Sequence, residues 1–330
     1  MKAWYLEDYT GLAGLRLVED APRPEPAEGE VLVRLALAAL NPADRYLAEK
    51  LYPAHPDLPH ILGRDGIGTV EAVGAGVSTY KPGDRVLLMR GDAGVTRSGT
   101  LAEYVSVPQD ALATPPSHWQ DAECAGAPLV YCTAYQALTQ WGDLPQGATV
   151  LVTGASGGVG MGTIHLGRAM GYRVIGTSRS TGAKADPLRE QGADLILDTN
   201  AESFRNEVRD FAGKDGVALI VDNLGGPHLP KAIDTLGFGG RVSCVGMLAG
   251  PVPKFNTARL FFKRLRIGGV AVGTYSAEEA KAAWAEVVRL MDRAGRRPLV
   301  DHTFPMDDVI AAFERLAAGP LGKVLVRVGA

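Results

Sequence analysis

The sequence contains little cysteine. It has three cysteines, Cys124, Cys132 and Cys244, an odd number with no C-x-x-C pair. A disulfide framework needs paired cysteines, and a four-cysteine structural zinc site needs one residue more. Both are therefore excluded. Cys124 and Cys132 stand eight positions apart on a predicted helix among alanine, leucine and valine, and we expect both to be small core residues, because free cysteine is commonly buried.

The chain also lacks a long apolar run and a block of one charge. Its longest apolar stretch, Val31 to Leu40, contains Arg34 and is shorter than the about 20 residues of a membrane helix. The beginning, M-K-A-W-Y-L-E-D, has no apolar signal-peptide core. The formal net charge is −3 with acids and bases interleaved, which disfavours polyanionic partners. We therefore expect a cytoplasmic protein that does not span a membrane and does not bind nucleic acid.

The length of the chain indicates two globular domains, because 330 residues exceed the usual length of one domain. The first ~115 residues show short alternating runs between Pro/Gly turns, typical of a barrel-like or partly rolled sheet. A helix is predicted from Asp121 through Thr139, and strands and helices alternate after it, which predicts a parallel, doubly wound sheet. Its strands are expected near 149–153, 173–177, 194–197, 217–221, 240–245 and 267–272. The tail predicts helices at 277–294 and 307–316 and a strand at 323–328.

A glycine-rich turn follows the first of these strands. Residues 149–160 read T-V-L-V-T-G-A-S-G-G-V-G, a β-branched run that suits a buried strand and then three glycines spaced three apart. Such glycines permit a tight turn, and the N-terminus of the helix behind them attracts a pyrophosphate. The pattern also occurs for packing alone. The candidate dinucleotide ligands in this turn are Gly154, Ser156, Gly157, Gly158, Val159 and Gly160.

The end of the second strand selects the form of the dinucleotide. Where an NAD site places an acidic residue about 20 positions after the turn, this chain reads Ser178-Arg179-Ser180. A guanidinium can bind a 2′-phosphate through two charged hydrogen bonds, and the hydroxyls can add more. NADP(H) is therefore favoured over NAD(H). Lys184 could join this group or be a solvated surface lysine.

Further cofactor contacts follow from topology, because ligands of doubly wound sheets bind beyond the carboxyl ends of the strands. This nominates Asp222-Asn223 and Gly225-Gly226 after one strand, and Val245, Gly246 and Met247 after the next. For the glycines, ordinary turn formation is the alternative.

Seven segments stand in order along the chain, and they read P-E-P-A-E-G-E-V-L-V-R at 24–34, N-P-A-D-R-Y at 41–46, Y-K-P-G-D-R-V at 80–86, G-T-L-A-E-Y at 99–104, T-A-Y-Q-A-L at 133–138, G-A-S-G-G-V-G at 154–160 and G-K-V-L-V at 322–326. Together they resemble the medium-chain dehydrogenase/reductase superfamily. The resemblance implies an α/β fold in which a Rossmann domain, residues 121–267, is inserted into a GroES-like β-barrel catalytic domain of residues 1–120 plus 268–330. It also implies a homodimer through an edge of the Rossmann sheet.

The resemblance also bears on whether this chain carries the ligands of a zinc ion. Zinc-dependent members carry Cys where this chain has Asn41, and a His-Glu pair where it has Arg64-Asp65. An amide and a guanidinium cannot replace thiolate and imidazole as zinc ligands. The chain is therefore similar to the zinc-independent branch, which contains NADPH:quinone oxidoreductases and enoyl-thioester reductases, and we expect no metal. Arg64 and Asp65 could bind a substrate oxygen or form a scaffold where the zinc shell would be.

Without a Lewis acid, conjugate reduction is the natural chemistry, because charge then develops on an oxygen that needs only a hydrogen bond or a proton. By the resemblance, Asn41, Tyr46 and Tyr52 line the nicotinamide and substrate pocket. Tyr52 could be a proton donor or only line the pocket. The expected function is an NADPH-dependent reductase of a quinone or an α,β-unsaturated carbonyl.

Two other functions remain open. One is a 2-enoyl thioester reductase, for which Lys263, Arg264 and Arg266 are candidate ligands of the carrier's phosphates. The other is an NADPH-binding regulatory protein without turnover. Phe261 and Phe262 are candidates for the substrate mouth or for contact with a dimer partner.

Overall fold

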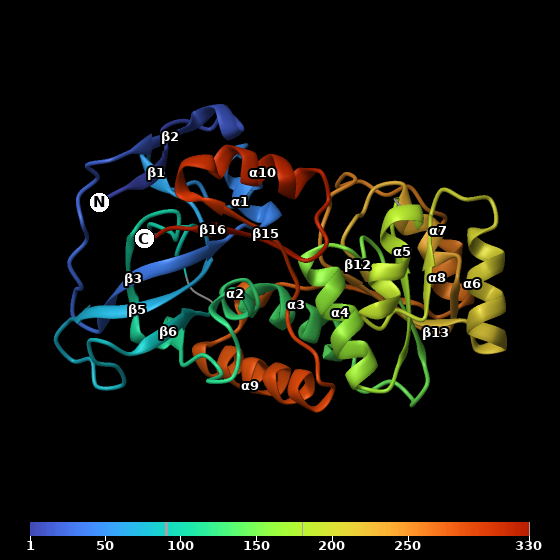
Figure 1. Cartoon of the computed structure of the whole chain (residues 1–330). Helices are drawn as coiled ribbons and strands as arrows, with labels where there is room; N and C mark the ends of the chain where they lie inside the picture. The colour runs from blue at the N-terminus through green and yellow to red at the C-terminus, as the bar shows by residue number, and fades with distance from the viewer. Residues whose placement is uncertain (90–91, 180, 330) are drawn as a thin grey trace. The chain divides into compact units, whose positions relative to one another are not determined.

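The computed structural model describes residues 1–89, 92–179 and 181–329. The chain divides into two compact units (Figure 1). Unit 1 consists of Met1–Leu129, Tyr275–Lys281 and Pro298–Ala330, and unit 2 of Val130–Thr274 and Ala282–Arg297.

Unit 1 is built mainly from antiparallel strands. One sheet has the order β15-β16-β3-β5-β6-β8 with β7 also paired to β3, and a smaller sheet has the order β2-β1-β4. The strands are β1 (Ala3–Leu6), β2 (Leu15–Val18), β3 (Glu30–Ala39), β4 (His60–Ile61), β5 (Asp65–Val73), β6 (Arg85–Leu88), β7 (Tyr104–Pro108), β8 (Leu112–Ala113), β15 (Val300–Pro305) and β16 (Lys323–Arg327). Val31, Leu32, Val33 and Leu35 of β3 are all buried, so side chains on both faces of this strand are covered.

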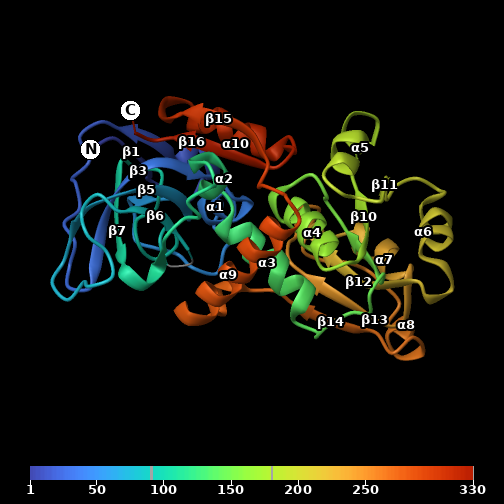
Figure 2. The same ribbon diagram turned by 60° about the horizontal axis from the view of Figure 1, so that its bottom comes forward.

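The pairing of the two chain ends determines where unit 1 can hold a site. The C-terminal strand β16 lies antiparallel beside β3, with Leu325 opposite Ala39 (Figure 2). On the other side of β3, Asp65 at the start of β5 is also opposite Ala39. The end of β3 and the starts of β5 and β16 therefore meet at one place in the sheet.

The helices of unit 1 differ from the prediction at one point. The helix predicted from Asp121 through Thr139 is wrong as a single element, because α2 (Asp121–Ala125) ends before α3 (Pro128–Thr139) begins. Pro128 has no N–H to continue the preceding turn and suits the first position of a new helix. The remaining regular helices with residues in this unit are α1 (Pro42–Ala48), α9 (Ala277–Arg293) and α10 (Val309–Ala317).

Unit 2 contains the predicted parallel sheet. Its strands have the order β11-β10-β9-β12-β13-β14, which in chain order is the 3-2-1-4-5-6 arrangement of a doubly wound Rossmann fold. The strands are β9 (Thr149–Val152), β10 (Arg173–Thr177), β11 (Leu195–Leu197), β12 (Val217–Asp222), β13 (Leu236–Cys244) and β14 (Arg266–Gly269). The α/β fold class predicted from the sequence, with GroES-like and Rossmann parts, is confirmed.

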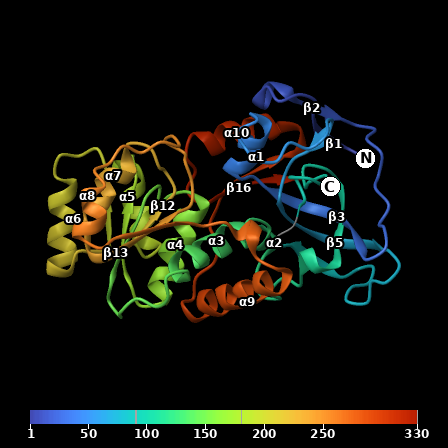
Figure 3. The same ribbon diagram turned by 180° about the vertical axis from the view of Figure 1, so that it is seen from behind.

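Helices cover both faces of this sheet. On one face, α6 (Phe204–Ala212) and α7 (His228–Ile233) pack against Leu151, Ile175 and Ile220 (Figure 3). On the other face, α4 (Gly158–Ala169) lies so close to the sheet that a Cβ at Gly167 would be 3.1 Å from Val174. The other helices of unit 2 are α5 (Thr181–Glu190) and α8 (Ala258–Phe262).

The two units differ in extent from the predicted domains. The predicted second boundary, after residue 267, cuts through β14, which pairs along its length with β13 and so belongs to unit 2. Most of α9 also lies in unit 2, while residues 275–281 lie in unit 1. Sequence periodicity cannot assign such a helix, because its apolar face fits either core equally well. In the described ranges, no helix has the length and apolar character to cross a bilayer.

Candidate functional site

The glycine turn of unit 2 connects β9 to α4. Gly154 has φ of +64°, which L side chains rarely adopt. A Cβ at Gly160 would lie 2.4 Å from the Gly154 carbonyl oxygen, so the turn and the helix can approach only without a side chain there. At Gly157 a Cβ would meet nothing nearer than 3.7 Å. Gly154 and Gly160 are thus required by the fold, whereas Gly157 borders open space.

Gly157 is also the N-cap of α4, and it has no side chain to cap the helix. The backbone N–H groups of the first helical turn lack partners within a helix, and the helix dipole adds positive potential there. Gly158 and Val159, which are partly exposed, supply such groups. This combination of open space and uncapped donors suits a pyrophosphate, so the residues fit a dinucleotide.

Polar side chains lie beside this turn at the end of β10. Ser178 and the exposed Arg179 follow the strand directly. Lys184 extends from α5 to Ser156 in the glycine turn, with Nζ 3.2 Å from Oγ, so it is not simply a solvated surface lysine. Ser180, named with this group, lies outside the described residues.

The residues nominated after β12 brace the turn. The Thr153 hydroxyl donates to Asp222 Oδ1 at 2.6 Å, and Asn223 Nδ2 donates to the Thr153 carbonyl at 2.8 Å. Burial raises the pKa of Asp222, opposed by the Thr153 bond. Asn223 therefore joins the ends of β9 and β12. The sequence analysis missed Thr153, because its role depends on a strand 70 residues away.

Val245, Gly246 and Met247 follow β13 at the same end of the sheet. The N–H groups of Val245 and Gly246 donate to the Asp222 carbonyl at 2.8 and 3.2 Å. A Cβ at Gly246 would lie 2.7 Å from the Asn223 carbonyl oxygen, so this glycine is required for packing. The predicted cofactor residues of unit 2 thus lie at the carboxyl ends of adjacent strands.

Unit 1 holds a second group of polar residues, where β3, β5 and β16 meet. Asn41 Nδ2 donates to Asp65 Oδ2 at 2.9 Å, and Lys323 Nζ donates to Asn41 Oδ1 at 2.7 Å. Lys323 Nζ also lies 3.5 Å from Asp65 Oδ2 and donates to the Leu40 carbonyl at 2.9 Å. Asp65 Oδ1 accepts the N–H of Leu129 at 3.2 Å. The buried Asn41 amide is therefore occupied on both its oxygen and its nitrogen.

A second ion pair continues this group toward the surface. Asp44 accepts the Asn41 backbone N–H at 2.8 Å and Arg64 Nε at 3.2 Å. Arg64 Nη1 donates to the Tyr52 hydroxyl at 3.0 Å, and its Cζ lies 4.4 Å from the centre of the Tyr52 ring. We call Asn41, Asp44, Arg64, Asp65 and Lys323 the buried charge network. Its two carboxylates and two cations balance in formal charge.

Burial dominates the electrostatics of the network. It raises the pKa of Asp65 and lowers the pKa of Lys323, and the attraction between the two opposes both shifts. Burial likewise raises the pKa of Asp44, opposed by the Arg64 charge. Each charge is thus tolerated only because its partner is in place.

The remaining predicted residues of unit 1 have different surroundings. Tyr46 on α1 is partly buried, which raises its pKa, and the nearby Glu49 raises it further. Tyr52 is partly exposed and is the residue that connects the network to the surface. Lys323 was missed as a site residue, although it stands in the quoted G-K-V-L-V segment. The signal available in the sequence was a lysine at the first position of a largely apolar strand.

Other candidate positions have local roles. Lys263 Nζ donates to the carbonyls of Asp234 and Leu236 at 3.3 and 2.6 Å, so it is occupied within unit 2. Phe261 and Phe262 are 65% and 75% exposed.

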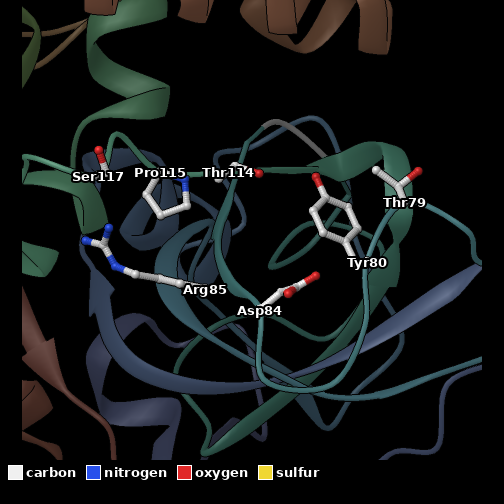
Figure 4. A pocket seen from close by; sticks show the side chains of 7 residues that line it. All are labelled: Thr79, Tyr80, Asp84, Arg85, Thr114, Pro115 and Ser117. Carbon is white, nitrogen blue, oxygen red and sulfur yellow. The ribbon is translucent and has the colours of Figure 1, made fainter.

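A hollow of about 460 Å³ on unit 1 is lined by Thr79, Tyr80, Asp84, Arg85, Thr114, Pro115 and Ser117 (Figure 4). The guanidinium of Arg85, which lines this hollow, already donates to Asp121. No group of three His, Cys, Asp or Glu side chains in the described part of the chain is arranged to hold a metal.

Comparison with known proteins agrees with these features. The family model of the alcohol dehydrogenase GroES-like domain matches residues 27–117, and that of the zinc-binding dehydrogenases matches residues 158–293. The quinone oxidoreductase of Lama guanicoe is 31% identical over 99% of this chain and 97% of its own length.

Solved structures show the same fold along the whole chain. The Escherichia coli quinone oxidoreductase, solved with NADPH, has a TM-score of 0.89 and 26% identity, covering 99% of this chain and 100% of the other. An NAD-dependent alcohol dehydrogenase has a TM-score of 0.90 and 29% identity, with 100% of both chains covered. The chain therefore belongs to the medium-chain dehydrogenase/reductase superfamily of oxidoreductases, in its quinone oxidoreductase branch.

Proposed function

We propose that this oxidoreductase uses NADPH to deliver hydride, without a metal, to a quinone or an α,β-unsaturated carbonyl. The observation that carries the proposal is the buried charge network, three of whose residues, Asn41, Arg64 and Asp65, stand by the resemblance where zinc-dependent members carry Cys, His and Glu. Zinc needs free thiolate, imidazole or carboxylate donors. Here the Asn41 amide is occupied and the Asp65 oxygens accept hydrogen bonds. Two side-chain cations, Arg64 and Lys323, also stand there, so the residues do not fit a zinc ion.

The choice of NADPH is supported by the residues around the glycine turn. Arg179 at the end of β10 and Lys184 beside Ser156 supply positive charge there, and no acidic residue stands at the three positions after that strand. NADPH supplies a hydride when bound. The turn would bind its pyrophosphate, and Arg179 its 2′-phosphate. The NADPH in the Escherichia coli relative agrees with this choice.

In unit 1, Tyr52 and Tyr46 are the proposed substrate residues. Hydride addition to the β-carbon of an enone leaves negative charge on the carbonyl oxygen, and the Tyr52 hydroxyl would hydrogen-bond this oxygen and give it a proton. Asn41 would act indirectly, by holding the end of β3 to Asp65 and Lys323. A quinone accepts the same hydride and yields a hydroquinone anion that water can protonate.

The experiment follows NADPH oxidation with a 1,4-quinone, a 2-enal and crotonyl-CoA in parallel, with NADH as a control. We expect turnover of the quinone and the enal and a preference for NADPH. Turnover of crotonyl-CoA alone would instead establish the 2-enoyl thioester reductase. Tight NADPH binding without turnover of any acceptor would establish the regulatory protein. For Tyr52→Phe we expect the enal rate to fall by about 100-fold or more; an unchanged rate would remove its role as an acid.

Gly157 and Gly160 give a paired prediction about the cofactor. Gly157→Ala places a methyl group in open space, so we expect unchanged thermal stability but NADPH binding weakened by about tenfold or more, because the pyrophosphate approaches the backbone there. Gly160→Ala would meet the Gly154 carbonyl at 2.4 Å, and we expect a loss of about 1–3 kcal/mol in stability. Melting curves measure the thermal stability of the two variants, and titration with NADPH measures their affinity for the cofactor. Unweakened binding by Gly157→Ala would contradict a cofactor at this turn.

We also propose a homodimer through the edge of the unit 2 sheet. β14 is the last strand of that sheet, and Ile267 on it is 37% exposed. Phe261 and Phe262 are exposed in the same unit with their ring centres 4.5 Å apart, and a contiguous exposed apolar patch can mark an interface. Light scattering on the purified protein measures the mass of the assembly.

A further inference from the structure

Arg64 has a specific relation to the Tyr52 hydroxyl. A guanidinium carries five N–H donors and no acceptor, and it keeps its proton at all relevant pH values. In the contact of 3.0 Å between Nη1 and the Tyr52 oxygen, Arg64 must therefore donate and Tyr52 must accept. The phenol O–H cannot point at Arg64. Its proton remains available for another acceptor.

The guanidinium is fixed by contacts on several sides. Nε donates to Asp44 Oδ1 and Nη2 to the Ala43 carbonyl, both at 3.2 Å. The guanidinium carbon also lies 4.4 Å from the centre of the Tyr52 ring, within the range of a cation–π contact. The Arg64 side chain is 11% exposed, and Asp44 is fully buried. Arg64 therefore holds the ring and the hydroxyl of Tyr52 together, while its own nitrogens are occupied.

We propose that Arg64 is the positioning residue for proton transfer, because it fixes the Tyr52 hydroxyl as a hydrogen-bond donor toward the substrate. This role rests on the proposed function. Bound NADPH would supply the hydride to the β-carbon and become NADP⁺; the π pair of the C=C bond would then form the double bond between the α-carbon and the carbonyl carbon, and the π pair of the C=O bond would move to the oxygen to give an enolate. The Tyr52 O–H bond breaks as the enolate takes its proton, and water returns a proton to the tyrosinate. Arg64, still protonated, donates to the Tyr52 oxygen throughout.

The first test uses the protein without cofactor or substrate. The tyrosine doublet in the Raman spectrum reports whether a phenol oxygen accepts or donates a hydrogen bond, and subtraction of the Tyr52→Phe spectrum isolates Tyr52. We expect the unaltered protein to show an accepting oxygen, and Arg64→Met to lose this character. Arg34→Met, a matched change at an exposed arginine of unit 1, should leave the spectrum unchanged. A purely donating oxygen in the unaltered protein would overturn the proposal.

The second test is kinetic and compares an enone, which needs a proton donor, with a quinone, which does not. For Arg64→Met we expect kcat with the enone to fall by about 10- to 100-fold and kcat with the quinone to fall less than about threefold. In the Tyr52→Phe background, Arg64→Met should cost nothing further, because residues acting through one another are not additive. Equal losses with both acceptors, or additive losses in the double variant, would overturn the role.

Two outcomes need separate handling. If Arg64→Met does not fold because Asp44 is left unpaired, the same comparisons are made with Asp44→Asn/Arg64→Met, which removes both charges. If the unaltered protein reduces neither acceptor with NADPH, the proposed function fails and the catalytic role of Arg64 fails with it. The Raman result then still shows whether Arg64 orients Tyr52. The failure of the contact and the failure of the function are therefore distinguishable.

Discussion

Replacing Arg179 by aspartate is expected to weaken NADPH binding by about 100-fold or more and NADH binding by less than about threefold. The two cofactors differ only in the 2′-phosphate, whose charge-assisted hydrogen bonds to Arg179 would contribute about 1.5–3 kcal/mol each. Two lost bonds correspond to at least about 100-fold in affinity. Aspartate also repels the phosphate, and it can accept hydrogen bonds from the ribose hydroxyls of NADH.

Titration calorimetry with each cofactor measures this difference. Arg189→Asp is the matched control, since Arg189 is an exposed arginine of α5 that pairs with Asp186, three residues away on the same helix. It should change neither affinity by more than about threefold, because exposed ion pairs contribute little. An equal loss of NADPH and NADH binding in Arg179→Asp would show that the residue acts on folding and not on the 2′-phosphate.

Removing the charge of Lys323 is expected to give the largest loss of stability. Lys323→Met leaves Asp65 fully buried without its cation and leaves Asn41 Oδ1 without its donor. Breaking one side of a buried ion pair typically costs about 3–5 kcal/mol. We expect the apparent melting temperature of the ligand-free protein to fall by about 10 °C.

The double variant Asp65→Asn/Lys323→Met separates charge from shape. It removes the unpaired carboxylate while keeping a side chain of nearly the same size, so we expect it to recover most of the lost stability. Arg16→Met is the control, because its pair with Glu7 is exposed, and it should change stability by less than about 1 kcal/mol. A Lys323→Met variant as stable as this control would contradict the structural importance of the network.

The sequence predicted the Rossmann unit well, for a local reason. Strand, turn and helix around Gly154 are encoded within a few residues, and the alternation of strands and helices predicts a parallel, doubly wound sheet. The prediction of one continuous helix from Asp121 to Thr139 was wrong, because it rested on the apolar periodicity and ignored Pro128. The ends of the two compact units differ from the predicted domain boundaries, because the packing partners of β14 and α9, and not their own residues, place them in a unit.

The candidate site divides in the same way. The residues of the glycine turn could be named from spacing alone, because the backbone that binds a phosphate is continuous in the chain. The bracing of this turn by Thr153 and Asp222 could not be predicted from spacing, because Thr153 follows β9 and Asp222 ends β12. Asn41 was named as a pocket residue, yet its amide is occupied by Asp65 and Lys323. Its direct catalytic role stays a prediction, and the contacts support a positioning role.

By itself, then, the sequence determined the family and the α/β fold, because seven motifs stand in order along the chain. It also determined the position of the glycine turn, because that turn depends on residues close together in the chain. Only the tertiary structure decided which partners Asn41, Arg64 and Asp65 have. Lys323 reaches Asn41 from 282 positions away, and Arg64 reaches Tyr52 across a loop. Buried charges are tolerated only as pairs, and which charges pair is determined by strand register at the junction of β3, β5 and β16, which no local pattern records.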